Sequence, residues 1–487
     1  MARLSRAGGS QVTASYLDLG NIGAASYDLT NSTLQVSENE TIGGFEFPAI
    51  FIQDGGTNMG GNLFLESSSE YDFYGGNFVC FVFFNGGVFN QWGGNINDLD
   101  GPWQGQYNLA GGTLTTGGLG LPSGGYYGEG GFNSLQTGGT NIVGGIALGG
   151  AGRGTYTLTN GTLMASSLDV GIFESPIDVY SDSGNTFIQS GGYHTNGAVS
   201  INGLNNGYYG VFLSYYQLSG GTLATPSISV NVRQFAQSEG TNDEGVISFN
   251  DDAANFNENN GSAYVFSGGE LIAGTVSLTG ATFVHSGGAL GSPTVIILTN
   301  GVWNEETNGA QLGQLQLGAG SNSIISFSTG SSVLQFTDSS GVPWATNGLL
   351  TVKNWNGSLY GGGQQQLVFG DSQTALTTQQ LAEVQFQSPA GLASGTYPAR
   401  ILADGEVVPD SGSSLPPNIE LLSGRSNGAF SMAVQGNAGQ NYELDASTDL
   451  AHWVTMSTQS NSTGTVNFSD NGASNYPQRF YRARASD

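Results

Sequence analysis

Two short patterns alternate along the first 300 residues of this chain and decide its fold. One is represented by Tyr156-Thr-Leu-Thr-Asn-Gly-Thr-Leu163 and the other by Phe187-Ile-Gln-Ser-Gly-Gly192. Self-similarity at a fixed period is typical of repeat proteins, in which each repeat packs on its neighbours. Further copies of the Tyr-Leu pattern begin at Tyr27, Tyr107, Tyr216 and Tyr264, and further copies of the Phe-Gln pattern at Phe51, Ser134, Phe235 and Phe283.

The spacing of these copies predicts a unit of two coils. Copies that begin at 107, 134, 156, 187, 216, 235, 264 and 283 are about 25 residues apart, and copies of one pattern are about 50 apart. We interpret Tyr71, Phe81 and Ile296 as the starts of weaker copies. A propeller blade of about 40–45 residues is the alternative, but it needs four unlike strands per period. Here each half of the period carries the same aromatic-to-glycine pattern.

Within each copy the apolar residues lie two apart, which predicts strands. Tyr156 and Leu158 face one side while Thr157 and Thr159 face the other. The Gly-Gly or Asn-Gly that follows permits positive φ and a corner, and a second alternating run follows each corner. We therefore predict an all-β parallel β-helix, a β-solenoid with Tyr stacked on Phe inside it. We expect right-handed winding, because parallel crossovers are almost always right-handed.

The pattern changes after about residue 322, so we predict five parts. These are an N-terminal segment or cap (1–25), a solenoid of coils (26–322), the final solenoid coils and a C-terminal cap (323–407), a linker (408–418) and a small β-sandwich (419–487). The strands Ile324–Phe327 and Val333–Phe336 lack the glycine corner, and Leu376–Val384 is the one short helix expected. The sandwich is expected to be immunoglobulin-like or fibronectin-III-like, from its strand spacing.

Composition excludes several classes of protein. The 80 glycines follow no strict Gly-X-Y period, so collagen is excluded, and 11% aromatic residues argue against disorder. A formal charge of -27 repels phosphate backbones, so we expect no nucleic-acid partner. Cys80 stands alone and permits no intrachain disulfide. We find neither a signal peptide nor an 18-residue apolar span, and therefore expect no membrane span.

Parallel β-helices can support polysaccharide lyases and hydrolases, but the residues for that chemistry are sparse. The basic residues within the predicted solenoid, Arg153 and Arg233, lie about three coils apart. The pairs Asp243/Glu244, Asp251/Asp252 and Glu305/Glu306 fall in what we interpret as loop-like insertions, without the repeated partner that inverting hydrolysis needs. The histidines His194, His285 and His452 are isolated, and His285 occupies the glutamine position of its repeat. We therefore predict that the protein is not an enzyme and holds no cofactor.

Two kinds of binding site are suggested by the residues outside the repeat. Asp98, Asp100 and Gly101 are spaced like part of a calcium loop, although Ile96 occupies a ligand position and no Glu follows. A turn rich in Asx side chains explains them equally well. Exposed aromatic residues could serve as glycan contacts, with loop packing as the alternative, and the candidates are Trp92, Trp103, Tyr126, Tyr127, Tyr208 and Tyr209.

Two stretches resemble known families. The tract from Gly154 to Gly171 and its copies resemble the passenger repeats of bacterial autotransporter-like and exosortase-sorted (PEP-CTERM-type) surface proteins, which are β-helical. Downstream motifs in the same order, including Leu350–Gly357 and Gly395–Leu402, are similar to the segment that closes those passengers. The ending, with Trp453 and Pro477–Arg482, resembles a small β-sandwich of secreted proteins from Verrucomicrobia. The usual sorting signal is not seen before Asp487, which puts anchoring by that route in doubt.

The resemblance implies an extracellular or cell-surface setting in a bacterium. Together with the low charge and the polar, uncharged coils, it favours a non-catalytic structural or surface protein. We expect such a protein to assemble with itself into a filament, array or matrix, through the solenoid ends and the C-terminal sandwich. The alternative is a surface adhesin that binds carbohydrate of the cell envelope or the environment through the exposed aromatics.

Overall fold

We describe the protein from a computed structural model. It describes residues 2–44, 46–97, 99, 104–120, 132–149, 154–172, 184–202, 205–206, 210–211, 214–231, 233–251, 262–291, 294–319, 322–411, 417–426, 429–436, 440–462 and 464–486. The chain divides into two compact units, residues 1–302 and residues 303–487, which are described separately. Nearly all of the described secondary structure is β, and most pairings are parallel, as the sequence predicts.

In the described part of the first unit, all elements of regular secondary structure are strands. They are β1 (Ala2–Ala7), β2 (Gln11–Leu19), β3 (Ala25–Thr30), β4 (Thr33–Ile42), β5 (Ala49–Glu66), β6 (Ser69–Gln91), β7 (Asn95–Asn97), β8 (Gln104–Leu109), β9 (Thr113–Thr116), β10 (Leu119–Gly120), β11 (Phe132–Gln136), β12 (Thr140–Val143), β13 (Ile146–Gly149), β14 (Gly154–Leu158), β15 (Thr162–Ala165), β16 (Leu168–Ile172), β17 (Thr186–Asn196), β18 (Val199–Asn202), β19 (Asn205–Asn206), β20 (Gly210–Val211), β21 (Tyr215–Asn231), β22 (Gln234–Asn250), β23 (Ala263–Thr279), β24 (Thr282–Leu290) and β25 (Val295–Thr299).

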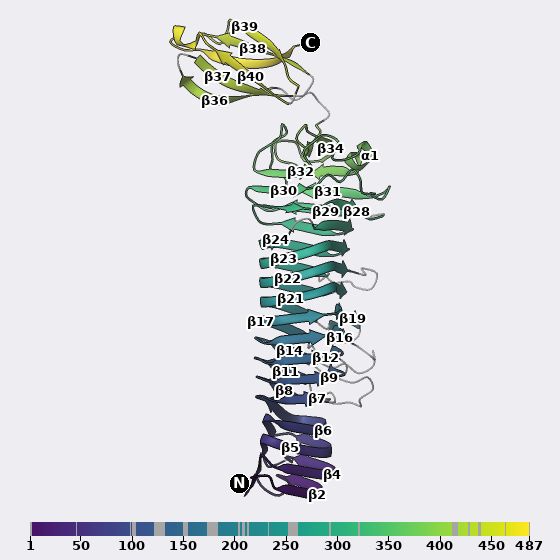
Figure 1. The fold of residues 1–487 in the computed structure, drawn as a ribbon. Coiled ribbons are helices and arrows are strands. Elements are labelled where there is room, and N and C mark those ends of the chain that lie inside the picture. The colour runs from purple at the N-terminus through teal and green to yellow at the C-terminus, as the bar shows by residue number, and fades with distance from the viewer. Residues whose placement is uncertain are drawn as a thin grey trace. The chain divides into compact units, whose positions relative to one another are not determined.

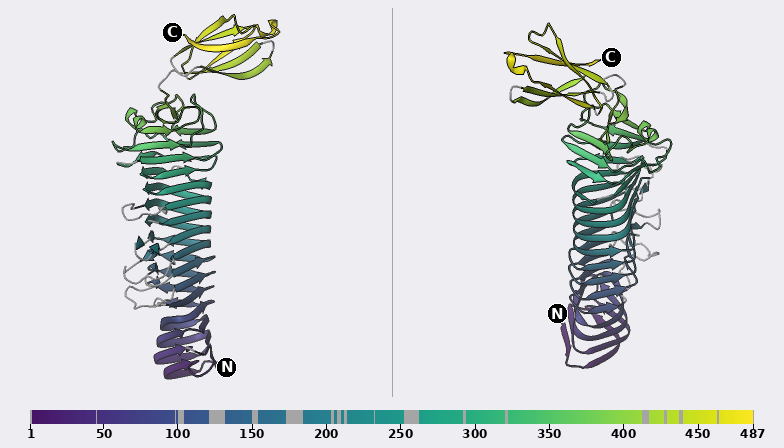
Figure 2. Two further views of the ribbon diagram at one scale, coloured as in Figure 1. Left: turned by 180° about the vertical axis from the view of Figure 1, so that it is seen from behind. Right: turned by 45° about the horizontal axis from the view of Figure 1, so that its top comes forward.

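One coil of the first unit contains three strand segments. β11, β12 and β13 pair in parallel with β14, β15 and β16 of the next coil, with Ser134 opposite Tyr156 and Ile146 opposite Leu168. The longer strands β21, β22 and β23 run through the corners and pair with one another along most of their length. Figures 1 and 2 show these strands lying one above another in a single column. The backbone hydrogen bonds therefore run between coils.

The register corrects three assignments of the repeat. The copy that follows Tyr71 begins at Phe89, opposite Tyr107, whereas Phe81 lies opposite Asn62 and is 48% exposed. Ile296 lies opposite Val276 on another strand segment and begins no copy. Stacking also begins before residue 26, because β1 pairs with β3 and β2 with β4.

A column of aromatic rings fills the interior beneath the first strand segment of each coil. Neighbouring ring centroids are 4.6–5.8 Å apart, and most pairs are stacked nearly parallel. The column is interrupted at Ser134, between Tyr107 and Tyr156. Such pairs stabilise beyond their apolar burial, and the predicted Tyr-on-Phe stacking is confirmed. The column consists of Tyr27, Phe51, Tyr71, Phe89, Tyr107, Tyr156, Phe187, Tyr216, Phe235, Tyr264 and Phe283.

The alternation of the two patterns has a hydrogen-bonding cause, which we call the Gln–Tyr clasp. Tyr156 Oη donates to Gln136 Oε1 at 2.6 Å, and Gln136 Nε2 donates to the Thr162 carbonyl at 2.9 Å. Both bonds join a Phe-Gln coil to the Tyr-Leu coil that follows it. The same two bonds occur at the pairs Gln53/Tyr71, Gln91/Tyr107, Gln189/Tyr216 and Gln237/Tyr264.

A third polar side chain completes most clasps. Asn141 Nδ2 donates to Tyr156 Oη at 2.9 Å, and Asn58 and Asn242 do the same in their coils. His194 takes the place of this asparagine, with Nδ1 3.0 Å from Tyr216 Oη. In these four clasps the buried hydroxyl has both a donor and an acceptor, as buried polar groups generally do.

The glycine corners are required by conformation and by space. Gly139 has φ +65°, and a Cβ there would lie 2.7 Å from the Gly112 carbonyl oxygen of the preceding coil. Its counterparts in most other coils also have positive φ. Because neighbouring coils approach this closely at the corner, only glycine fits there without strain.

We expect Gly139→Ala to lower the free energy of unfolding by about 1–3 kcal/mol, through left-handed strain and the backbone contact. Gly117→Ala is the matched control, since a Cβ at Gly117 meets nothing within 4 Å. Denaturant titration of both variants measures the difference. Equal stabilities would contradict a special role for the corner.

We expect Tyr156→Phe to destabilise the first unit by about 1–3 kcal/mol, because it leaves Gln136 Oε1 and Asn141 Nδ2 buried without their partner. Tyr193→Phe is the control, since Tyr193 is 44% exposed. Denaturant titration should show a change within about 0.5 kcal/mol for the control. A loss of similar size in both would count against the clasp.

The second unit has the only α-helix of the described residues. Its elements are β26 (Val302–Glu305, at the division between units), β27 (Gly309–Leu312), β28 (Leu315–Leu317), β29 (Asn322–Phe327), β30 (Ser332–Phe336), β31 (Leu349–Lys353), β32 (Gln365–Phe369), α1 (Thr378–Ala382), β33 (Val384–Gln387), β34 (Thr396–Ile401), β35 (Glu406–Pro409), β36 (Asn418–Ser426), β37 (Ala429–Gln435), β38 (Asn441–Ser447), β39 (Val454–Ser460), β40 (Thr465–Asp470), a 3₁₀ turn (Ala473–Asn475) and β41 (Phe480–Ser486).

Parallel pairing gives way to antiparallel pairing within this unit. β29–β31–β33 and β27–β30–β32 pair in parallel, whereas β33 pairs with β34, and β34 with β35, in antiparallel fashion. The capping box of Thr377 and Gln380 begins α1 inside the predicted helix. β35 extends to Pro409, so the strand includes the first two residues of the predicted linker. The end of the chain forms two antiparallel three-stranded sheets, β36-β37-β40 and β39-β38-β41.

These two sheets share one apolar cluster. Met432 and Val434 of β37 and Phe468 of β40 pack with Tyr442 and Leu444 of β38. Salt bridges from Arg482 Nε and Arg484 Nε to the buried Asp445 tie β41 to β38, with N···O distances of 3.0 and 3.1 Å. The alternating sequence patterns at 430–434, 442–445, 465–468 and 480–482 predict strands, and these lie in β37, β38, β40 and β41.

Candidate functional site

One outward-facing column of the first unit departs from its own repeat. The column is formed by the residue that follows the Leu or Gln position of each coil, just before the corner. From Thr137 onward this residue is always Thr or Ser, and several of its hydroxyls donate to a carbonyl of the preceding coil, as Thr159 Oγ1 does to Gln136. At two successive coils the residue is instead Tyr74 and then Trp92, and the next is Ala110.

Tyr74 and Trp92 are stacked on each other at the surface. Their ring centroids are 6.1 Å apart with planes inclined by 14°, and the residues are 49% and 50% exposed. Trp92 Nε1 donates to Asp72 Oδ1 at 3.3 Å, which holds the indole in place. Large aromatic side chains at this exposure keep apolar surface in contact with water, so they can bury it against a ligand.

Polar side chains of the same three coils lie beside the rings. Asn90 Nδ2 donates to Glu70 Oε1 at 2.5 Å and to Asp72 Oδ1 at 2.9 Å, and Asn108 Nδ2 donates to Asn90 Oδ1 at 2.7 Å. These bonds fix the carboxylates while leaving Glu70 Oε2 and Asp72 Oδ2 with no bond from a described residue. The site, called the Trp92 patch below, consists of Glu70, Asp72, Tyr74, Asn90, Trp92 and Asn108.

The Trp92 patch is acidic. Burial, followed by the charges of Asp72, Glu70 and Asp54, raises the pKa of Tyr74. No lysine or arginine occurs between Arg6 and Arg153 in the sequence. The patch therefore offers carboxylate acceptors and apolar rings without a nearby basic residue along the chain.

Of the residues predicted from sequence as glycan contacts, Trp92 lies in this patch. Trp103, Tyr126, Tyr127, Tyr208 and Tyr209 lie outside the residues that the structure describes, as do the calcium candidates Asp98 and Asp100. Elsewhere, within the described residues, no cluster of three or more His, Cys, Asp or Glu side chains is arranged to hold a metal ion.

Sequence reasoning missed the other members of the patch. The copies Tyr71-Asp-Phe-Tyr-Gly-Gly76 and Phe89-Asn-Gln-Trp-Gly-Gly94 contain Tyr74 and Trp92 at the position that is Ser or Thr in most other copies. Alignment of all copies would have revealed this departure. The incorrect placement of a copy at Phe81 hid it, because Phe89–Gly94 was not recognised as a repeat.

The paired carboxylates are placed differently from the expectation. Asp243 and Glu244 lie inside strand β22, not in a loop insertion, and Asp243 is exposed whereas Glu244 is buried. Glu305 is likewise buried in β26, where it accepts from Trp303 Nε1 at 3.1 Å, while Glu306 is exposed. Successive strand residues face opposite sides, so neither pair forms a site of two carboxylates. Asp251 is described, but Asp252 lies outside the described residues.

Most of the histidine and arginine residues considered above that the structure describes are buried. Burial lowers the pKa of His194 to about 3, which keeps the ring neutral in the Gln–Tyr clasp. His285 is buried against Phe266, with ring centroids 5.6 Å apart. His452 is exposed beside Asp449, which raises its pKa. Arg233 is buried, and Arg153 lies outside the described residues.

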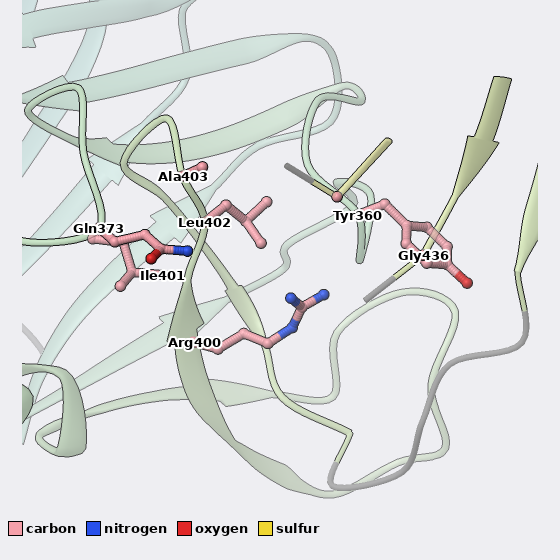
Figure 3. A pocket seen from close by; sticks show the side chains of 8 residues that line it. Tyr360, Gln373, Arg400, Ile401, Leu402, Ala403 and Gly436 are labelled. Atoms are coloured by element: carbon pink, nitrogen blue, oxygen red, sulfur yellow. The ribbon is translucent and has the colours of Figure 1, made fainter. Parts of the chain in front are cut away.

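A small pocket in the second unit is too narrow for a sugar or a nucleotide (Figure 3). Its volume is about 40 Å³, which is room for roughly two or three water molecules. Arg400 is among the lining side chains, and one of its guanidinium nitrogens donates to the Leu359 carbonyl at 2.5 Å. The other lining residues are Tyr360, Gln373, Ile401, Leu402, Ala403, Gly436 and Gly464.

Buried Glu244 predicts a pH dependence of stability. Burial raises the pKa of Glu244 to about 10, and neither carboxyl oxygen has a hydrogen-bond partner among the residues that the structure describes. Because the folded pKa lies above the ordinary value of 4.5, the contribution of this group to stability is fully present below pH 4.5 and is lost as the pH rises toward 10.

We expect Glu244→Gln to raise the melting temperature at pH 9 and to change it little at pH 4. Glu239→Gln, an exposed position of the same strand, is the control and should shift neither value. Thermal unfolding followed by circular dichroism measures both. A gain at pH 4 equal to that at pH 9 would refute the assignment.

No family model matches this chain, and no curated protein and no solved structure matches it significantly. Among the described residues, the helices are all too short or too polar to span a bilayer.

Proposed function

We propose that this protein is a non-catalytic structural or surface protein, a rigid stack that assembles with itself outside a bacterial cell. The observation that carries the proposal is the continuous interior of the first unit. Stacked rings and Gln–Tyr clasps tie most coils to the next, and apolar or hydrogen-bonded side chains fill the space between the strands. Because each coil contacts only its neighbours, such contacts repeat along one direction, which is the arrangement expected of a rod.

We also propose the finer architecture expected from the sequence. Residues 26–322 would form a right-handed parallel β-helix, residues 323–407 its final coils and cap, and residues 419–487 an immunoglobulin-like or fibronectin-III-like sandwich. The parallel register of the coils supports the first assignment. The apolar cluster shared by the two antiparallel sheets supports the last.

Unpaired strand edges support self-assembly. Among the described strands, β1 pairs only with β3 and β2 only with β4, so one edge of each is open. The two antiparallel sheets have four further edge strands, β36, β40, β39 and β41. Open edges present rows of backbone donors and acceptors to another chain. Placement at the bacterial surface is supported by the resemblance to passenger repeats.

The purified protein is expected to form filaments, arrays or a matrix as its concentration increases. Light scattering should then give a mass above the 50.3 kDa of one chain, and negative-stain electron micrographs should show ordered assemblies. The substitution Thr13→Pro within β2 should reduce assembly, because it removes a backbone donor from an edge strand. A protein that stays monomeric at every concentration would refute self-assembly.

A further inference from the structure

In the Trp92 patch, the position that is Ser or Thr in most coils is occupied by Tyr74 and Trp92, and carboxylates lie beside their rings. Ser or Thr occupies the corner position in coil after coil, and these residues serve the coil itself by hydrogen-bonding its neighbour. Among the described residues, the Tyr74 side chain makes no hydrogen bond to the preceding coil, and Trp92 Nε1 donates to the Asp72 carboxylate and not to a backbone carbonyl. Each ring residue leaves about half of its surface in water. The stack does not need them for its own stability, since the coils on either side do without them.

The combination of groups in the patch suits a sugar. One side of the indole faces Tyr74, and the next residue of the column on the other side is Ala110, whose side chain is a single methyl group. A pyranose ring has an apolar C–H face that can pack on such a ring and hydroxyls around its rim that need partners. Glu70 Oε2 and Asp72 Oδ2 can accept from those hydroxyls, and charge-assisted bonds of this kind are the stronger ones.

The polar groups are held in place before any ligand arrives. Asn90 bonds Glu70 and Asp72 together, Trp92 Nε1 bonds Asp72, and Asn108 extends the network by one coil. A site fixed in this way loses little side-chain entropy on binding. Because adjacent coils are about 4.8 Å apart, the patch offers repeated contacts along the stack that suit a chain of sugars better than a single unit.

Charge decides which sugars fit. The site carries Glu70 and Asp72, with Asp54 nearby, on a protein of formal charge -27. Uronate, sialate and sulfate groups would be repelled there, and the local sequence has no lysine or arginine to pair with them. We propose that the Trp92 patch is a binding site for glycan chains without acidic groups, which stack on Trp92 and Tyr74 and donate hydroxyls to Glu70 and Asp72.

The proposal is tested by isothermal titration of the full chain with neutral and acidic glycans. The probes are a soluble β-1,3-glucan, a β-1,4-glucan oligosaccharide, an α-mannan and, as the acidic glycan, alginate. We expect at least one neutral glycan to bind and alginate not to bind. Trp92→Ala and Tyr74→Ala should each lower the affinity for the neutral glycan at least tenfold, and Asp72→Asn should lower this affinity less.

Tyr193→Ala is the matched control, because Tyr193 is an equally exposed tyrosine of the same unit, 44% exposed and outside the patch. The Tyr193→Ala variant should bind the glycan as the unaltered protein does. Thermal unfolding followed by circular dichroism should give the same melting curve for Trp92→Ala and for the unaltered protein. Should Trp92→Ala perturb folding, Trp92→Phe replaces it and should retain part of the affinity. Failure of every neutral glycan to bind, equal binding of alginate, or full binding by a folded Trp92→Ala variant overturns the proposal. Glycan binding is read independently of self-assembly, so failure of one leaves the other standing.

Discussion

The side-chain carboxamide of one interior glutamine per pair of coils is the constraint on which the first unit depends. A tyrosine hydroxyl inside a dry stack must find both a donor and an acceptor, and the glutamine of the preceding coil supplies the acceptor. Because the glutamine amide also bonds a backbone carbonyl of the following coil, it sets which residues lie opposite each other. Apolar packing alone would tolerate a slipped register, whereas a clasp with defined partners does not.

The clasp explains why the repeat is a pair of coils and not a single one. A coil that carries Phe and Gln has no hydroxyl to satisfy, and a coil that carries Tyr and Leu has no acceptor to offer, so each needs the other as its neighbour. The asparagine on the next strand segment belongs to the same network, and His194 shows that a neutral imidazole can replace it. The burial that lowers the pKa of His194 follows from its place inside this network.

Strict demands on the interior and at the corners leave the outward positions free to vary. Corner glycines such as Gly139 are fixed by close approach of the coils, and interior rings by stacking. Neither requirement applies to the outward residue before the corner. Tyr74 and Trp92 can therefore occupy the position that is Ser or Thr in other coils. A binding surface can in this way arise on a repeat without loss of the stack that supports it.

The sequence by itself determined the strands, the alternation of Tyr-Leu with Phe-Gln coils and the glycine corners, because period-two alternation and positive φ are local properties. It also located the helix, since α1 (Thr378–Ala382) lies within the predicted Leu376–Val384, and the strands of the last sheets. Only the tertiary structure decided which residues lie over one another. Steps between copies vary from 19 to 31 residues, so the register depends on insertions whose length says nothing about pairing. The sequence alone therefore predicts Phe81 as an interior residue and Asp243 as a loop residue. The backbone hydrogen bonds between coils place Phe81 outside, Asp243 in a strand, and Tyr74 and Trp92 in one column.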